Sequence, residues 1–153
     1  MRSGGVRRGF RRLPGSTTGG AALELAVIFP ILLLLLIGVI DYGRAFFTAI
    51  VVTNAARAGA EYGARDPAYS SDTAAMRIFA EADGQETGVQ ASARRYCECG
   101  AGVANASCNA CPGGAAPDVY AEVTARKTVT MFLRYPGLPS SINISRKMSF
   151  RSQ

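Results

Sequence analysis

The chain has 153 residues, the size of one domain with an extension, and its 48% hydrophobic content excludes disorder throughout. It contains no His, which excludes His-dependent catalytic triads, His-ligated metal sites and a His-ligated haem. Lys and Arg exceed Asp and Glu by 17 to 11, but residues 1–20 alone hold five Arg and no acid. Residues 41–153 are nearly neutral, with 12 basic and 10 acidic side chains. Because most of the excess positive charge lies in the tail and not on the folded part, we expect no nucleic-acid partner.

A strongly apolar segment follows the basic leader, which we place at residues 1–19. Residues 21–40 read AALELAVIFPILLLLLIGVI, with Glu24 as the only charge. Twenty helical residues span about 30 Å, enough to cross the hydrocarbon core of a bilayer. The run is longer than a signal-peptide core, and no A-x-A site follows it. We therefore expect residues 20–40 to form a single retained membrane span, with a cytoplasmic N-terminus because the arginines precede it.

The same helix is expected to continue beyond the membrane as a stem over residues 41–66. No breaker pair interrupts the chain before Asp66-Pro67, so the helix should run from about Ala21 to about Ala64. One face of the stem is apolar and suited to packing on a domain. That face consists of Phe47, Val51, Ala55, Ala58 and Tyr62. Three glycines weaken the helix by about 1 kcal/mol each relative to Ala, or else allow close helix packing in a filament. They are Gly43, Gly59 and Gly63.

The remaining residues, 67–153, predict a small exported α+β domain. Ser70-Ser71-Asp72 offers an N-cap for a second helix over 73–82. Its core-facing residues are Met76, Phe79 and Ala80. Alternating patterns predict strands over 89–97, over 119–125 with an extension to 132, and over 142–150. In the last strand Ile142, Ile144, Met148 and Phe150 should face inward, and residues 134–139 should form a loop before it. The sequence therefore predicts an antiparallel sheet of about three strands, with the long helix across its apolar face.

The four cysteines form two close pairs, Cys97-x-Cys99 and Cys108-x-x-Cys111, in a loop over residues 97–111. Four thiols at this spacing could hold zinc or form two disulfides. The predicted topology places them in an oxidising space, which favours disulfides. We expect no bound metal and no cofactor. A bridge from Cys97 to Cys99 would close a very small strained loop, so bridges between the two pairs are favoured, with the connectivity left open.

The segment around Glu24 has a recognisable arrangement. Gly19 stands five residues before Glu24, and the apolar run follows. This resembles the type IV prepilin signal, in which a basic leader and a Gly precede a hydrophobic stretch with Glu at its fifth position. The resemblance implies cleavage between Gly19 and Gly20, and contact of Glu24 with the N-terminal amine of a neighbouring subunit. A cut after Gly20 would instead place Glu24 at the fourth position. In a medium of low dielectric constant, the attraction between the ammonium and the carboxylate offsets the desolvation cost that each charge would have alone.

A longer stretch is similar to the TadE-like family. The run GGAALELAVIFPILLLLLIGVIDYGRAFF, followed by NAARAGAEYGA, resembles this family over roughly residues 19–66. The matching positions are Glu24, Pro30, Asp41, Tyr42, Gly43, Arg44 and residues 54–60. The resemblance implies a pilin-like fold and a structural role as a minor pilin or pseudopilin of tight-adherence (Flp) pili. It also implies a bacterial inner-membrane location, with the C-terminal domain periplasmic or extracellular, and incorporation into the pilus as an option. The implied partners are a prepilin peptidase, the major and minor pilins and the assembly platform.

No residue set in the sequence forms a catalytic constellation, and we do not expect an enzyme. The competing interpretation is a periplasmic binding module, one that could bind a metal, on an N-terminal anchor that is never cleaved. The position of the mature N-terminus separates these two interpretations.

Overall fold

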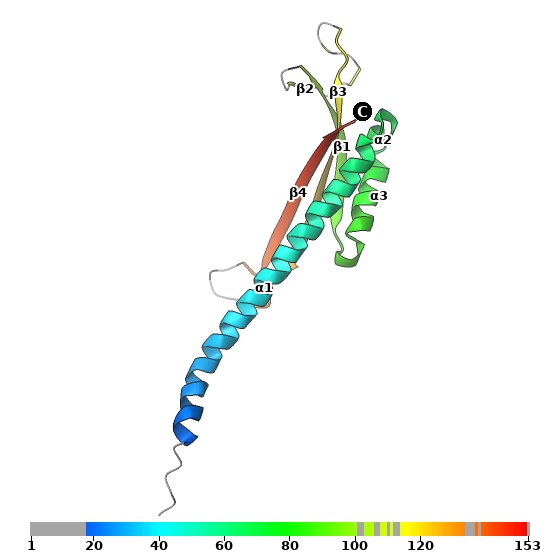
Figure 1. Ribbon diagram of the computed structural model, residues 1–153. Helices are drawn as coiled ribbons and strands as arrows, with labels where there is room; N and C mark the ends of the chain where they lie inside the picture. The colour runs from blue at the N-terminus through cyan, green and yellow to red at the C-terminus, as the bar shows by residue number, and fades with distance from the viewer. Residues whose placement is uncertain are drawn as a thin grey trace, which may run out of the picture. The chain divides into compact units, whose positions relative to one another are not determined.

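Figure 1 shows the computed structural model, in which residues 18–100, 103–105, 108–109, 111, 114–133, 137 and 139–152 are described. The chain divides into two compact units, residues 1–36 and residues 37–153, and we call the latter the C-terminal unit. One long helix, α1, runs from Thr18 to Ala64. The expected N-terminal helix is therefore confirmed. Most of the basic leader and most of the expected 134–139 loop lie outside the described residues.

Two shorter α-helices follow α1, where the sequence predicts one. In α2 (Pro67–Ser71) the Asp66 carboxylate caps the first turn by accepting a hydrogen bond from the Ala68 N–H at 2.8 Å. Pro67 suits this first turn because a residue there has no intrahelical acceptor for an N–H. The expected second helix is α3 (Thr73–Asp83), capped by Asp72, which accepts from the Ala75 N–H at 2.9 Å. A short 3-10 turn, η1 (Gln85–Thr87), leads into the sheet.

The sheet is antiparallel, with strand order β2-β1-β3-β4. Its strands are β1 (Gln90–Cys99), β2 (Val103–Asn105), β3 (Asp118–Thr130) and β4 (Ser141–Arg151). The three long strands confirm the predicted α+β class and the sheet of about three strands. The three-residue β2 lies inside the cysteine loop, and the sequence did not indicate it because so short a strand shows no alternation.

The hydrophobic core lies where the inner face of the sheet meets the second half of α1 and α3, as Figure 1 shows. One cluster joins α1 to the residue before β1 and to β3. It consists of Val52, Ala55, Ala56, Val89 and Ala125. A second cluster joins α1, α3 and β3. It consists of Ala60, Met76, Ala80, Ala121 and Val123.

The face of α1 that was expected to pack on the domain is confirmed in part. Ala55 is buried, and Val51 and Tyr62 pack against the core clusters, but Phe47 is 61% exposed. The buried positions in this part of α1 are Val52, Ala55, Ala56, Gly59, Ala60 and Gly63. These small residues let the α1 backbone approach the sheet and α3 closely, and large rings could not fit in that narrow space.

Gly59 and Gly63 mark the closest approach. A Cβ placed on Gly59 would lie 2.5 Å from the carbonyl oxygen of Met76 in α3. A Cβ on Gly63 would lie 2.7 Å from the Ala121 Cβ in β3. Both glycines thus make their close contacts within this chain, whereas the sequence suggested contacts between helices of a filament. Gly43 faces open space.

Two further core assignments are also wrong. Phe79 is 47% exposed and stacks on Tyr62, with ring centroids 4.2 Å apart, while Met76 and Ala80 of the same helix are buried as expected. Ile142 is 40% exposed because it lies near the start of the edge strand β4. The other inward residues of β4, Ile144, Met148 and Phe150, pack against the core clusters.

Candidate functional site

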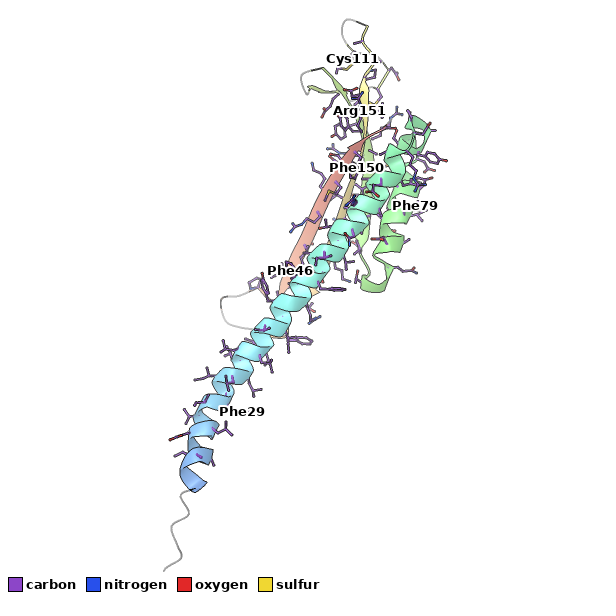
Figure 2. All side chains as sticks on the ribbon, in the orientation of Figure 1. Phe29, Phe46, Phe79, Cys111, Phe150 and Arg151 are labelled. Atoms are coloured by element: carbon purple, nitrogen blue, oxygen red, sulfur yellow. A yellow bond between two sulfur atoms is a disulfide. The ribbon has the colours of Figure 1, made fainter. Side chains whose placement is uncertain are left out.

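The apolar part of α1 presents its side chains outward. By length and composition, α1 is the one helix in the described part of the chain that could cross a membrane, and no residue of its most apolar window is buried. Apart from half-buried Ile37, the exposed fraction of its large side chains runs from 40% at Leu33 to 70% at Leu23. Figure 2 shows side chains projecting from this part of the helix around Phe29. A helix satisfies its own backbone hydrogen bonds, so such a segment is suited to a lipid environment.

The three predicted processing and contact residues lie together at the start of α1. Gly19 and Gly20 belong to its first turn, and Glu24 follows one turn later with an exposed side chain. A Cβ on either glycine would meet nothing within 4 Å. Within the described part of the chain, Glu24 has no ion-pair partner. If this part of the helix lies in lipid, the carboxylate requires a partner from outside the chain, or water, to offset the cost of placing a charge there.

Asp41 occupies a second site, at the end of the apolar run. Its side chain is only 7% exposed and reaches the segment that follows β3. Both carboxylate oxygens accept from the Phe132 N–H at 3.0 Å, and Oδ2 also accepts from the Leu133 N–H at 3.1 Å. One turn along α1, the Arg44 guanidinium lies 3.9 Å from Oδ1 and 4.3 Å above the Phe132 ring centroid. Asp41 and Arg44 therefore fix the end of β3 against α1.

These contacts change the acidity of Asp41. The hydrogen bond from the Phe132 N–H, followed by that from the Leu133 N–H, holds the pKa of the carboxyl below its usual range. Burial raises this pKa, and the charge of Arg44 lowers it. The effect of the two N–H donors is larger than that of burial, because backbone N–H bonds favour the carboxylate over its protonated form.

The family comparison covers both sites. Residues 19–61 match the family model described as TadE-like protein. The chain carries a TadE-like segment. The match includes Gly19, Glu24 and the whole Asp41–Arg44 stretch, and it confirms the resemblance found in the sequence. No curated protein and no solved structure matches the chain.

The sequence identified Asp41 only as a position of the TadE-like pattern and did not predict its structural role. A single acid at the end of an apolar run is ordinary at a membrane boundary. Its partners are backbone N–H groups about 90 residues later in the chain. Backbone donors carry no sequence signature, so the pairing could be found only in the folded structure.

Asp41→Asn should make the C-terminal unit less stable at pH 7, with a difference from wild type that disappears in acid. The ionised carboxylate stabilises the fold above the pKa of the unfolded state, about 3.9, and this contribution is lost as the pH falls through the lower folded pKa. The measurement is the thermal midpoint of the full chain in detergent, from pH 7 to strongly acidic buffer. Asp83→Asn, at an exposed carboxylate, is the control. A difference that stays constant across the whole pH range would contradict this role.

The cysteine loop lies outside the TadE-like match. Cys97 is paired with Cys108 and Cys99 with Cys111, each with a Cα–Cα distance of 5.4 Å. The bridges join the two short motifs, as favoured from the sequence, and they define the connectivity that the sequence left open. They tie the end of β1 to the segment before β3. All four sulfurs are then engaged, so none remains as a thiolate ligand for zinc.

The purified, unreduced protein is expected to contain no titratable thiol. Its mass should be about 4 Da below that of the reduced chain, because two bridges remove about 1 Da for each of four thiol hydrogens. Intact-mass spectrometry before and after reduction checks this. Four reactive thiols accompanied by bound zinc would establish the metal-site alternative.

Proposed function

We propose that the chain is a structural minor pilin or pseudopilin that assists assembly of a bacterial tight-adherence pilus. The observation that carries this proposal is the TadE-like match over residues 19–61, which begins at Gly19 and includes Glu24. The exposed apolar helix supports it, because a pilin subunit must pass from the bilayer into a bundle of similar helices. Such association in lipid rests on packing and polar contacts and not on the hydrophobic effect.

In this proposal a prepilin peptidase cuts between Gly19 and Gly20 on the cytoplasmic face of the inner membrane. The apolar helix stays in the mature chain, and the C-terminal unit lies in the periplasm or outside the cell. Glu24 then meets the new N-terminal amine of a neighbouring subunit. The further partners are the major and minor pilins and the assembly platform. The role of the chain is structural, with no chemistry of its own.

The processing step is tested at Gly19. The mature chain should begin at Gly20, and Gly19→Val should remain a full-length precursor in the membrane. The peptidase must approach the backbone closely at the residue before the cut, and glycine obstructs this approach least. N-terminal sequencing and the loss of the mass of residues 1–19 are the measurements.

Gly15→Val, the same change within the leader, is the control and should still be cut. A wild-type mature chain that begins at Met1 would reject the pilin proposal and favour the uncleaved anchored binding module. A mature chain that begins at Ala21 would move the cut by one residue and leave Glu24 at the fourth position.

A further inference from the structure

Four exposed aromatic side chains lie near the start of the C-terminal unit. Three of its members lie on α1 just beyond the apolar run: Tyr42 is 73% exposed, Phe46 60% and Phe47 61%. The fourth, Phe132, is 67% exposed and follows β3. Figure 2 labels Phe46 on this part of α1. Rings of this size normally lie in a core or at an interface. Four exposed rings close together therefore indicate a surface that contacts lipid or another protein.

Contacts with Asp41 and Arg44 fix the position of Phe132 along the axis of α1. Its N–H donates to both oxygens of Asp41 at 3.0 Å, and its ring lies under the guanidinium of Arg44. Its backbone is therefore level with Asp41, the first residue after the apolar run. A residue that follows β3 is thus brought beside the helix by two side chains of α1.

The spacing along α1 places Tyr42 within the headgroup layer of a bilayer and Phe46 at its outer edge. Tyr42 and Phe46 lie two and six residues beyond Ile40, or about 3 and 9 Å along a helix. The polar layer on each side of the hydrocarbon core is roughly 5–8 Å thick. Phe132, level with Asp41, falls at the inner edge of that layer. Aromatic rings concentrate at this depth because they are apolar in body yet tolerate a polar boundary.

We propose that Phe132 is a second membrane anchor, inserted into the lipid interface beside Tyr42 and Phe46. The occupant of this surface is the outer headgroup layer, and Arg44 above the ring is placed to meet lipid phosphate. The inference rests on the proposed membrane location of α1. A single span leaves a domain free to rotate about the helix axis, whereas a lipid contact from a different element restricts that rotation. The anchor thereby selects which side of the C-terminal unit faces the membrane.

The chain contains no Trp, so single-Trp variants report their own surroundings without background. Three variants of the full chain are reconstituted at low density in phosphatidylcholine–phosphatidylglycerol vesicles, with or without lipids brominated in the upper acyl chain. Phe132→Trp tests the anchor, and Leu33→Trp reports the span itself. Phe79→Trp is the matched control, because Phe79 stacks on Tyr62, which lies about 33 Å beyond Ile40 along α1.

The expected result is a loss of emission of Phe132→Trp in brominated vesicles and a shift to shorter wavelength, with Phe79→Trp unaffected. If Leu33→Trp is quenched but Phe132→Trp is quenched no more than Phe79→Trp, the anchor is overturned and the span stands. If Phe132→Trp is shielded only when protein density is raised, its partner is another subunit and the lipid proposal fails. If Leu33→Trp also escapes quenching, both the span and the anchor are overturned.

Discussion

Gly59→Leu should abolish the folded C-terminal unit, whereas Gly43→Leu should leave it folded. Even the first atom of a side chain at Gly59 would meet the Met76 carbonyl oxygen at 2.5 Å and the Ala80 Cβ at 2.9 Å. A backbone oxygen cannot rotate away as a flexible side chain can, so α1 and α3 would have to separate and open the second core cluster. Gly43 has open space around it and lies on the same helix. The measurement is thermal unfolding of the full chain in detergent, followed by circular dichroism.

The graded form of this prediction uses alanine. Gly59→Ala adds one buried carbon, and overpacking of this kind costs about 1–3 kcal/mol. Against this, replacing Gly by Ala in a helix contributes up to about 1 kcal/mol of stability. Gly43→Ala should show only the gain in stability from replacing Gly by Ala in a helix, because nothing crowds that position. Equal stability of the Gly59→Ala and Gly43→Ala variants would mean that α1 and α3 are not in close contact.

Glu24→Ala should be processed normally and yet support no pili. Processing is retained because the leader and Gly19 are unchanged. Assembly is lost because Glu24 lies four residues, or one helical turn, from the amine created at Gly20 and is therefore at the depth of a neighbour's N-terminus. Removing the charge eases membrane insertion, so poor insertion cannot explain the loss. The measurements are N-terminal sequencing and electron microscopy of pili on cells that lack the wild-type gene.

Leu25→Ala provides the matched control, since it shortens the adjacent exposed side chain and keeps the carboxylate. It should assemble pili. Normal pili from the Glu24→Ala variant would show that the glutamate is only an interfacial side chain. Loss of processing in that variant would instead place Glu24 in recognition by the peptidase.

Features set by local pattern could be read directly from the amino-acid order. The apolar run, the absence of breakers before Pro67 and the alternation within β3 and β4 predicted α1 and the long strands, because helix and strand periods follow from backbone geometry. The N-cap of α3 was predicted within Ser70-Ser71-Asp72, because these residue types accept hydrogen bonds from the first N–H groups of a helix, and Asp72 provides it. Gly19, Glu24 and the TadE-like pattern were also found in the sequence, since the family model covers a continuous stretch.

Tertiary structure decided which apolar residues are buried and which polar groups meet. The sequence favoured Phe47 for the packed face of α1, but Phe47 is 61% exposed. At Gly59 and Gly63 the core admits no side chain at all, because a Cβ there would collide with α3 or β3. The tertiary structure also defined the cysteine connectivity, which the sequence left open. The link from Asp41 to Phe132 joins residues far apart in the chain through backbone N–H groups. Amino-acid order alone carries no signal for such a contact, because every residue except proline offers the same donor.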